Sequence, residues 1–164
     1  MGTTSKQVMD IKTSKGLSQT SNEALRAWTD KGWEQAMREG NYDRSREHLN
    51  FEVQKGGIVT PIDKKRPLTK RMAENLASRG IKDPNEGLAE PRFRTVVNFI
   101  FGGSTDRMRE LAFGNQEVDF ESKGGNGHVR RMPEIEEWAR DIYRFVADKY
   151  GEENIISFIV HCDE

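Results

Sequence analysis

The sequence predicts a protein of mixed helices and strands, in the α+β or the α/β class. Amphipathic patterns at 20–40 and 133–150 repeat their apolar residues with the spacing of a helix. Runs of β-branched and aromatic residues at 93–101 and 154–161 have the composition of strands. The predicted order is β-α-β-α-β-α-α-β, and helices and strands interleaved in this way share one core. With 164 residues and no internal repeat, the chain has the size of a single domain.

The first two elements are expected to be a strand and a long helix. The strand covers 5–12, where apolar and polar residues partly alternate. Thr20 and Glu23 form a capping box, which predicts a helix that starts there and stops at Gly40. The segment 41–43 is then the exit turn of this helix.

A second strand and a second helix follow. The strand is expected over 47–53, where apolar residues occupy alternate positions, and the glycine pair at 56–57 ends it. Pro67 suits the first turn of the helix, because its missing N–H has no helical partner there. Gly80 is the expected C-terminal glycine of the same helix.

The C-terminal half contains the strongest patterns. The run 93–101 is apolar on both faces, which predicts a central strand covered on both sides. Ser104 is the expected N-cap of a short helix. Pro133 opens the longest helix and Gly151 ends it. The last strand is expected over 154–161.

The composition is typical of a soluble intracellular domain. Hydrophobic residues make up 34% of the chain and charged residues 32%, so a modest core lies under a highly charged surface. The single cysteine, Cys162, excludes an internal disulfide and fits a reducing compartment. The sequence has neither the ~18 consecutive apolar residues of a membrane helix nor a signal-peptide pattern. We therefore expect a soluble, cytoplasmic protein with no membrane partner.

The segment 55–82 is strongly basic. It holds eight basic residues against two acidic ones, a balance of +6, and it includes Lys64, Lys65, Arg66 and Arg71. Such a cluster is a candidate phosphate-binding surface. The alternative is a solvated helix face whose lysines serve solubility.

The candidate metal or acid/base site follows the last predicted strand, where His161 precedes Asp163 and Glu164. A neutral imidazole is a common ligand of Mn, Zn or Ni, and carboxylates suit harder ions. The alternative is a solvated acidic tail. Cys162 and His161 do not form a catalytic dyad, because adjacent strand residues point to opposite faces.

Two more residues have a functional and a structural interpretation. Tyr42 is a candidate nucleophile, since tyrosine forms covalent phosphodiester adducts in some DNA enzymes; the alternative is a turn aromatic packed on its helix. His48 shares a strand face with Asn50, and we prefer a hydrogen-bonded strand histidine over a catalytic role.

Three sequence blocks, taken in order, resemble a known family. They are Arg44–Glu52, Tyr150–Ile155 and Val160–Glu164. The first is similar to an arginine-bearing His-Leu-Asn-aromatic strand, the second to a helix-to-strand junction, and the third to the start of an H-x-D-E-x-T-P-H-x-H motif. These three family motifs are found in the N-terminal domain of the MobV-type plasmid mobilisation proteins, also called plasmid recombination (Pre/Mob) enzymes, which this sequence therefore resembles.

The resemblance implies a relaxase, an enzyme that nicks one DNA strand at a plasmid transfer origin by metal-assisted transesterification. It implies an α+β fold, a palm-like antiparallel sheet flanked by helices, and single-stranded or hairpin DNA as the partner. A divalent cation, Mn or Mg, would be held by His161 and Glu164, with Glu164 near the catalytic centre and Asp163 beside it. The expected DNA-contacting residues are Arg26, His48, Asn50, Lys64, Lys65, Arg66 and Arg71.

The sequence departs from the family pattern in two places. The T-P-H-x-H half of the motif is absent, so we expect 1–164 to be a single, truncated relaxase-like domain that lacks its last motif strand and is inactive alone. The family's H-N-x-R block has no matching histidine: matching on Asn22 puts Ser21 at its position, and matching on Arg26 puts Glu23 there. The nucleophile is therefore unassigned, with Tyr42 as a candidate. The alternative function is a non-catalytic DNA-binding or regulatory module, and a third is a structural or interaction domain.

Overall fold

The structure is a computed structural model and describes residues 4–164. Its elements, in chain order, are β1 (Ser5–Ile11), α1 (Ser14–Ala24), α2 (Asp30–Glu39), the 3-10 helix η1 (Arg44–Leu49), β2 (Phe51–Gln54), β3 (Ile58–Thr60), α3 (Leu68–Ser78), β4 (Val96–Gly102), α4 (Thr105–Phe113), α5 (Pro133–Tyr150), the 3-10 helix η2 (Glu152–Asn154) and β5 (Ile159–Val160).

The strands form two small antiparallel sheets. β1 and β4 make a two-stranded ribbon, in register from Ser5 opposite Gly102 to Ile11 opposite Val96. The other sheet has the order β3-β2-β5, with both neighbours antiparallel to β2. The predicted α+β class with antiparallel strands is therefore confirmed, although the strands are divided between two sheets.

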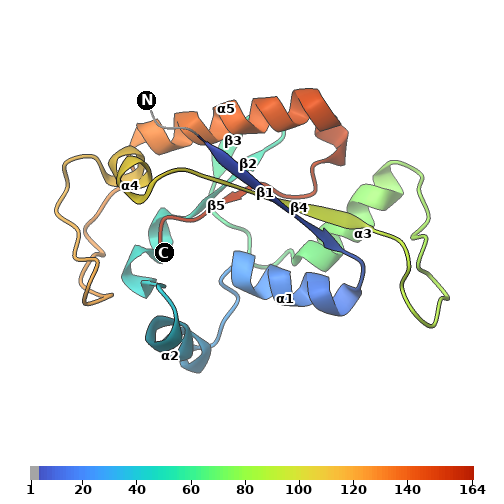
Figure 1. The fold of residues 1–164 in the computed structure, drawn as a ribbon, viewed down its shortest axis with the longest axis horizontal. Helices are drawn as coiled ribbons and strands as arrows, with labels where there is room; N and C mark the ends of the chain where they lie inside the picture. Colours follow the sequence, from blue (N-terminus) through green and yellow to red (C-terminus); the bar gives the residue numbers. More distant parts are fainter. Residues whose placement is uncertain (1–3) are drawn as a thin grey trace.

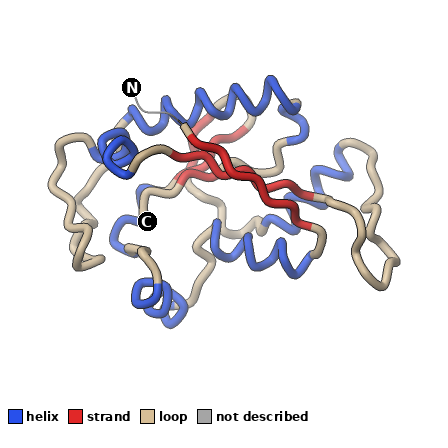
Figure 2. The backbone as a smooth tube through the Cα atoms, in the orientation of Figure 1, coloured by secondary structure: helices blue, strands red, loops and turns tan. Residues whose placement is uncertain are grey.

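Helices flank these strands on opposite sides (Figures 1 and 2). α5 lies along one side, and α1 and α3 lie on the other, where residues of both help to form one small hydrophobic cluster. Ile11 of β1 is buried in that cluster with Leu17 and Leu68, and Val96 and Ile159 pack against it. The β1–β4 ribbon is thus attached to β5 through side chains rather than through strand pairing.

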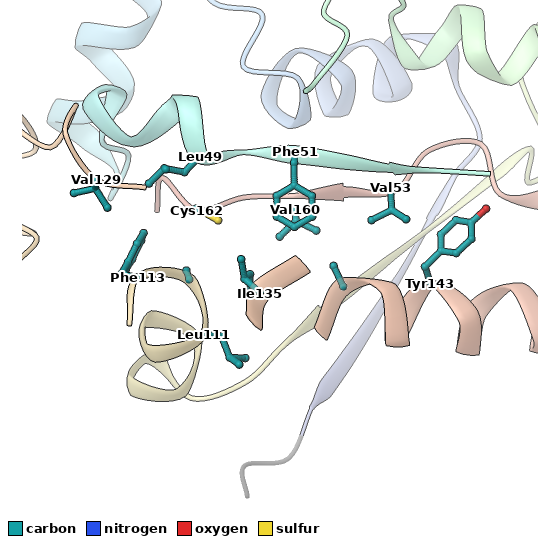
Figure 3. Packing of buried hydrophobic residues seen from close by; sticks show 12 residues of the cluster. Leu49, Phe51, Val53, Leu111, Phe113, Val129, Ile135, Tyr143, Val160 and Cys162 are labelled. Carbon is teal, nitrogen blue, oxygen red and sulfur yellow. The ribbon is translucent and has the colours of Figure 1, made fainter. Parts of the chain in front are cut away.

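The larger hydrophobic core lies between the three-stranded sheet and helices α4 and α5. Figure 3 shows Phe51 of β2 and Val160 of β5 directed toward Ile135 at the start of α5. Phe51 is fully buried, and Leu111 and Phe113 extend the cluster to α4. This packing fixes β5, and hence the residues that follow it.

The single helix predicted over 20–40 is wrong, because α1 ends at Ala24 and α2 starts at Asp30. Thr20 lies inside α1, whose N-cap is Thr13. The break is at Arg26, which has a φ of +53°. Ala27 N donates to Asn22 O at 2.9 Å, so a left-handed residue ends this helix as glycine usually does.

Three strand predictions also change. The segment predicted as a strand over 47–53 begins as the 3-10 helix η1, and the glycine pair 56–57 turns the chain into β3, which the sequence did not indicate. β4 pairs only with β1 among the described residues, and its Ile100 is 51% exposed, so it is no central covered strand. The last strand is regular only over Ile159–Val160.

Candidate functional site

A buried ion pair joins the end of α1 to the residues after β5. Arg26 and Asp163 are both 0% exposed. Arg26 Nε donates to Asp163 Oδ2 at 2.9 Å, and Nη2 donates to Oδ1 at 2.8 Å. Such paired hydrogen bonds are the strong, geometrically specific form of an arginine–carboxylate contact. Nη2 also donates to Glu164 Oε1 at 2.7 Å.

The pair is held in its charged form. Burial by itself lowers the pKa of Arg26, but its hydrogen bonds to Asp163 and Glu164 and the charges of both carboxylates raise it overall. Burial likewise raises the pKa of Asp163, and the guanidinium of Arg26 more than offsets this and lowers it. Proton transfer between these groups is therefore opposed from both sides.

Each of residues 161–163 is hydrogen-bonded to residues far away in the sequence. His161 Nε2 lies 2.7 Å from Ala24 O. Cys162 N donates to Asn50 Oδ1 at 2.6 Å, and Cys162 O accepts from Arg46 Nη1 at 2.7 Å. Burial is the largest effect on His161 and lowers the pKa of its imidazole, as does the charge of Arg26. Both effects favour the neutral form of the His161 imidazole.

Tyr42 lies against the same arginine. Its ring centroid is 4.6 Å from the guanidinium carbon of Arg26, and its hydroxyl donates to Glu23 Oε1 at 2.9 Å. Burial, the hydrogen bond to Glu23 and the charges of Glu164 and Glu23 raise the pKa of Tyr42 to about 12. A phenolate nucleophile is disfavoured in this arrangement, and a catalytic role of Tyr42 stays a prediction.

The basic segment contributes Lys64 to this site. Lys64 Nζ donates to Arg26 O at 3.1 Å and forms an ion pair with Glu47. Lys65 is exposed at the surface beside it. Arg66 is paired with Glu74, at 2.8 Å between Nη2 and Oε2.

Arg71 is buried, and its partners lie outside residues 161–164. Its guanidinium forms a buried ion pair with Glu52 and donates to Asp63 O at 2.8 Å and Ser157 Oγ at 3.1 Å. Its Nε donates to Arg66 O at 2.7 Å. The contacts give Arg71 a structural role, and its contact with DNA stays a prediction.

Acidic partners from outside the basic segment reduce its charge. Glu47 and Glu52 neutralise Lys64 and Arg71, and neither acid belongs to 55–82. A count along the sequence could not include them, because the fold alone brings them near. Of the four residues predicted from the basic segment (Lys64, Lys65, Arg66 and Arg71), Lys65 is the one for which no salt bridge is found among residues 4–164.

His48 and Asn50 do not share a site. His48 is exposed, and its Nε2 lies 2.7 Å from Val129 O. The preferred interpretation, a hydrogen-bonded histidine, agrees with this contact, although His48 lies in η1 rather than in a strand. Asn50 is buried and its Oδ1 accepts a hydrogen bond from Cys162 N, so it positions the residues after β5.

The fold is similar to that of a solved enzyme domain. No protein-family model and no curated protein matches the sequence. A solved structure, the MobM relaxase domain (MOBV; Mob_Pre) bound to plasmid pMV158 oriT DNA of 22 nucleotides, Mn-bound and crystallised at pH 4.6, matches over 98% of this chain at a TM-score of 0.57 and 16% identity. The chain has a relaxase-like fold. It spans 64% of the length of that relaxase chain.

The resemblance seen in the three sequence blocks is thus confirmed at the level of the fold. The relaxase-like fold places the first block in η1 and β2, and the third block on the strand beside them, β5, and its continuation. The third block supplies Asp163 to Arg26, and the first supplies Glu47 to Lys64, whose Nζ donates to Arg26 O.

The residues present do not fit a metal ion as they are arranged. Among residues 4–164, no group of three His, Cys, Asp or Glu side chains is close enough to hold one. Both oxygens of Asp163 and one oxygen of Glu164 are bonded to Arg26, and His161 Nε2 is bonded to Ala24 O. Metal ligation by His161 and Glu164 stays a prediction.

A second buried hydrogen-bond network holds Asp163 and was not predicted from the sequence. Asp43 accepts from Arg46 Nε and Asn126 Nδ2, both at 2.8 Å, and its N–H donates to Asp163 O at 2.7 Å. Hydrogen bonds from Ser45, Arg46 and Asn126 to its carboxylate lower the pKa of Asp43 despite its burial. The available signal was Asp43 as a cap two residues before Ser45, whose N–H it accepts at 3.0 Å.

Membrane insertion through a helix finds no support in residues 4–164, where every helix is too short or too polar to span a bilayer.

Proposed function

We propose that this protein acts in plasmid or mobile-element mobilisation as a relaxase-like DNA-binding protein. The observation that supports it is the fold shared over 98% of the chain with a relaxase domain whose crystal structure contains oriT DNA. The proposed ligand is single-stranded or hairpin DNA at a transfer origin, and the proposed location is the cytoplasm, where such DNA is processed.

The activity proposed for the complete relaxase site is the nicking of one DNA strand by transesterification, assisted by Mn²⁺ or Mg²⁺. The contacts of Arg26 with Asp163 and Glu164 do not leave a preformed cation site, so we assign no step to the ion. The raised pKa of Tyr42 also opposes nucleophilic attack from its hydroxyl. We therefore propose that residues 1–164 alone do not nick DNA.

The same two observations favour a second candidate function, a DNA-binding or regulatory module without catalysis. In that case the relaxase-like fold would serve recognition only. The two candidates differ in whether a covalent protein–DNA adduct can form, because a nicking relaxase remains attached to the strand it cleaves.

The proposed DNA surface is centred on the loop 61–67. Lys65 is exposed there, Lys64 and Arg66 lie beside it, and Lys64 connects the loop to Arg26. Lysine and arginine neutralise phosphates and release counterions, so binding weakens as salt rises. His48 is a further exposed candidate contact, whereas Arg26, Asn50 and Arg71 would have to leave buried partners to touch DNA.

A binding assay tests the DNA proposal. Fluorescence anisotropy with a labelled hairpin oligonucleotide should show affinity that falls with salt, and Lys65→Ala should weaken binding and reduce the salt slope by about 1. Lys82→Ala is the matched control, because Lys82 is an exposed lysine at the far end of the same segment. Binding that is independent of salt, or no binding at all, would remove both candidate functions.

An adduct assay separates the two candidates. The 22-nucleotide pMV158 oriT strand named with the relaxase structure is incubated with protein and Mn²⁺, and covalent complexes are detected on a denaturing gel. We expect none from residues 1–164. An adduct that disappears in Tyr42→Phe would contradict the proposed inactivity and would assign Tyr42 as the nucleophile.

A further inference from the structure

The outer edge of β1 has no partner strand in the part of the chain that the structure describes. β1 pairs with β4 on one side, and among residues 4–164 no backbone hydrogen bond joins 5–10 to any other segment. Residues 5–10 are all exposed, whereas those of β4 are partly buried apart from Ile100. β1 is therefore the outer strand of the ribbon, and its free N–H and C=O groups can pair with another chain.

β1 lacks most of the features that protect an edge strand from pairing. It contains no proline and no glycine, and its pairing with β4 runs without a bulge. Lys6 is its one basic residue, and a lysine on an edge ordinarily opposes association. Asp10 is its one acidic residue and lies four positions later, on the same face of the strand. The strand thus carries its own complementary charge.

We propose that β1 pairs with β1 of a second copy of this chain, antiparallel and centred on Val8, so that the two ribbons form one four-stranded sheet. In this register Lys6 of each copy lies opposite Asp10 of the other. Both copies use the same surface, so the contact closes as a two-fold dimer and does not extend into a fibre.

The centre of this register is apolar. Val8 is 55% exposed in the single chain and lies opposite Phe99 of β4. Pairing about Val8 sets the two valines against each other, and a row of Phe99, Val8, Val8 and Phe99 then crosses one face of the joined sheet. Aromatic and β-branched neighbours of this kind stabilise strand pairing.

The dimer is expected to be weak. Lys6 Nζ already donates to Tyr150 Oη at 3.0 Å, and Asp10 is 3.5 Å from Arg94, so neither charge is without a local partner. One strand from each copy also buries less surface than a standard protein–protein interface. The net charge of −1 gives the two copies little reason to repel each other. None of these residues belongs to the loop 61–67, so a failure of DNA binding would leave this proposal intact.

Charge reversal combined with sedimentation velocity tests the register without DNA. We expect the average mass to rise from that of one chain toward that of two as the protein concentration increases. Lys6→Asp should weaken the dimer about tenfold, because it sets like charges opposite each other twice. Lys6→Asp/Asp10→Lys should restore it. Lys12→Asp is the matched control, because Lys12 is an exposed lysine just beyond β1 and has no charged residue opposite it in this register.

Disulfide cross-linking locates the two-fold axis. In Val8→Cys the two introduced thiols would lie directly opposite each other, with Cβ atoms about 4.5–5.5 Å apart, close to the separation that a disulfide needs. The native Cys162 is buried and does not compete. Ile100→Cys is the control, because Ile100 is similarly exposed but the two copies of β4 would be about 14 Å apart. We expect rapid oxidation to a covalent dimer in Val8→Cys only.

Three results would overturn the proposal. The first is the mass of a single chain at every concentration. The second is a dimer that Lys6→Asp does not weaken in a variant whose fold is shown intact by circular dichroism. The third is faster cross-linking of Ile100→Cys than of Val8→Cys, because the contact would then lie on β4.

Discussion

Arg66 and Arg71 lie five residues apart and carry the same charge, but only one of them is buried. Arg71 is 4% exposed and bonded to Glu52, whereas Arg66 is paired with Glu74 at the surface. A buried pair that loses one member leaves an uncompensated charge, while a surface pair is solvated and screened. The two residues therefore separate structural from surface roles within one segment.

We expect Arg71→Ala to destabilise the protein by about 3–5 kcal/mol. Arg66→Ala should cause only a small change by comparison. Urea unfolding followed by circular dichroism measures both. An Arg71→Ala protein that keeps its stability but loses DNA binding would show that Arg71 is a DNA contact after all.

The tyrosines predict how stability responds to alkaline pH. Burial and the contact with Glu23 raise the pKa of Tyr42 to about 12, and burial and Glu152 raise that of Tyr143. A hydrogen bond from Lys6 lowers that of Tyr150. Groups with a raised folded pKa stabilise the fold below the unfolded pKa of about 10, and this contribution is lost as pH rises through the folded value.

During an absorbance titration of the folded protein, we therefore expect one tyrosine to ionise early and two to ionise late. Stability should decline as pH rises from about 10 toward 12. The variant Tyr42→Phe should remove one late-ionising group. Three tyrosines that all ionise together near pH 10 would contradict the contacts of Tyr42 and Tyr143.

At the scale of elements, the break between α1 and α2 shows where sequence patterns stop being informative. The apolar spacing continued through 20–40, and no glycine marked the helix end. Arg26 takes the left-handed conformation, which for a residue other than glycine costs of order 1–3 kcal/mol. Its bonds to Asp163, 137 residues later, stabilise that conformation. A local pattern cannot contain this information.

Elements with strong local signals were predicted well. Pro133 and Gly151 bounded α5, and Pro67 marked the start of α3. The single strand predicted over 154–161 failed in part, because only Ile159–Val160 pairs regularly with β2. β-branched composition indicates an extended chain, but the length of pairing depends on the partner strand.

The loop 114–132 is fastened to α2 by one lysine. Lys123 Nζ donates to Met37 O at 2.6 Å and to Gly40 O at 2.5 Å, at the C-terminal end of the helix. A cation there satisfies carbonyls that have no helical partner. The contact joins two segments that are 83 or more residues apart in the sequence.

We expect Lys123→Ala to lower stability by about 1.5–3 kcal/mol, the range for hydrogen bonds to charged groups. Amides in the last turn of α2 should also exchange faster with solvent. Lys31→Ala, which changes an exposed lysine at the start of the same helix, is the control. Equal effects of the two changes would mean that Lys123 does not hold the loop.

At the scale of the whole molecule, the core is unevenly distributed. The larger cluster lies around Phe51, between the three-stranded sheet and helices α4 and α5 (Figure 3). The cluster beneath the β1–β4 ribbon is small. Stability should therefore depend mainly on the larger cluster. β4 carries Ile100 with half of its surface exposed.

We expect Phe51→Ala to cost about 3–5 kcal/mol, because it removes a large side chain from a site with no access to water. Ile100→Ala should change stability little. Thermal unfolding of both variants is the measurement. Comparable losses would show that the β1–β4 ribbon contributes as much to the core as the larger sheet does.

The candidate site could be predicted only in part from the sequence. His161, Asp163 and Glu164 were found because they follow an apolar strand, and Arg26 was found through the family's arginine. Their mutual arrangement could not be found, because it depends on contacts between the two ends of the chain. The count of charges along 55–82 also overestimated its free positive charge, because Glu47 and Glu52 lie outside this segment and pair with Lys64 and Arg71 only in the fold.

The fastening of residues 161–163 also has a consequence for synthesis on the ribosome. Ala24, Asp43, Arg46 and Asn50 each contact that tripeptide, at separations of more than 100 residues. Until residues 161–163 leave the ribosome, Arg26 lacks Asp163 and Arg46 lacks Cys162 O, so we expect the segment 24–50 to be incompletely folded. N-terminal segments usually begin to fold first during translation. We therefore expect the nascent chain to be most open to chaperones and proteases before residues 161–163 emerge.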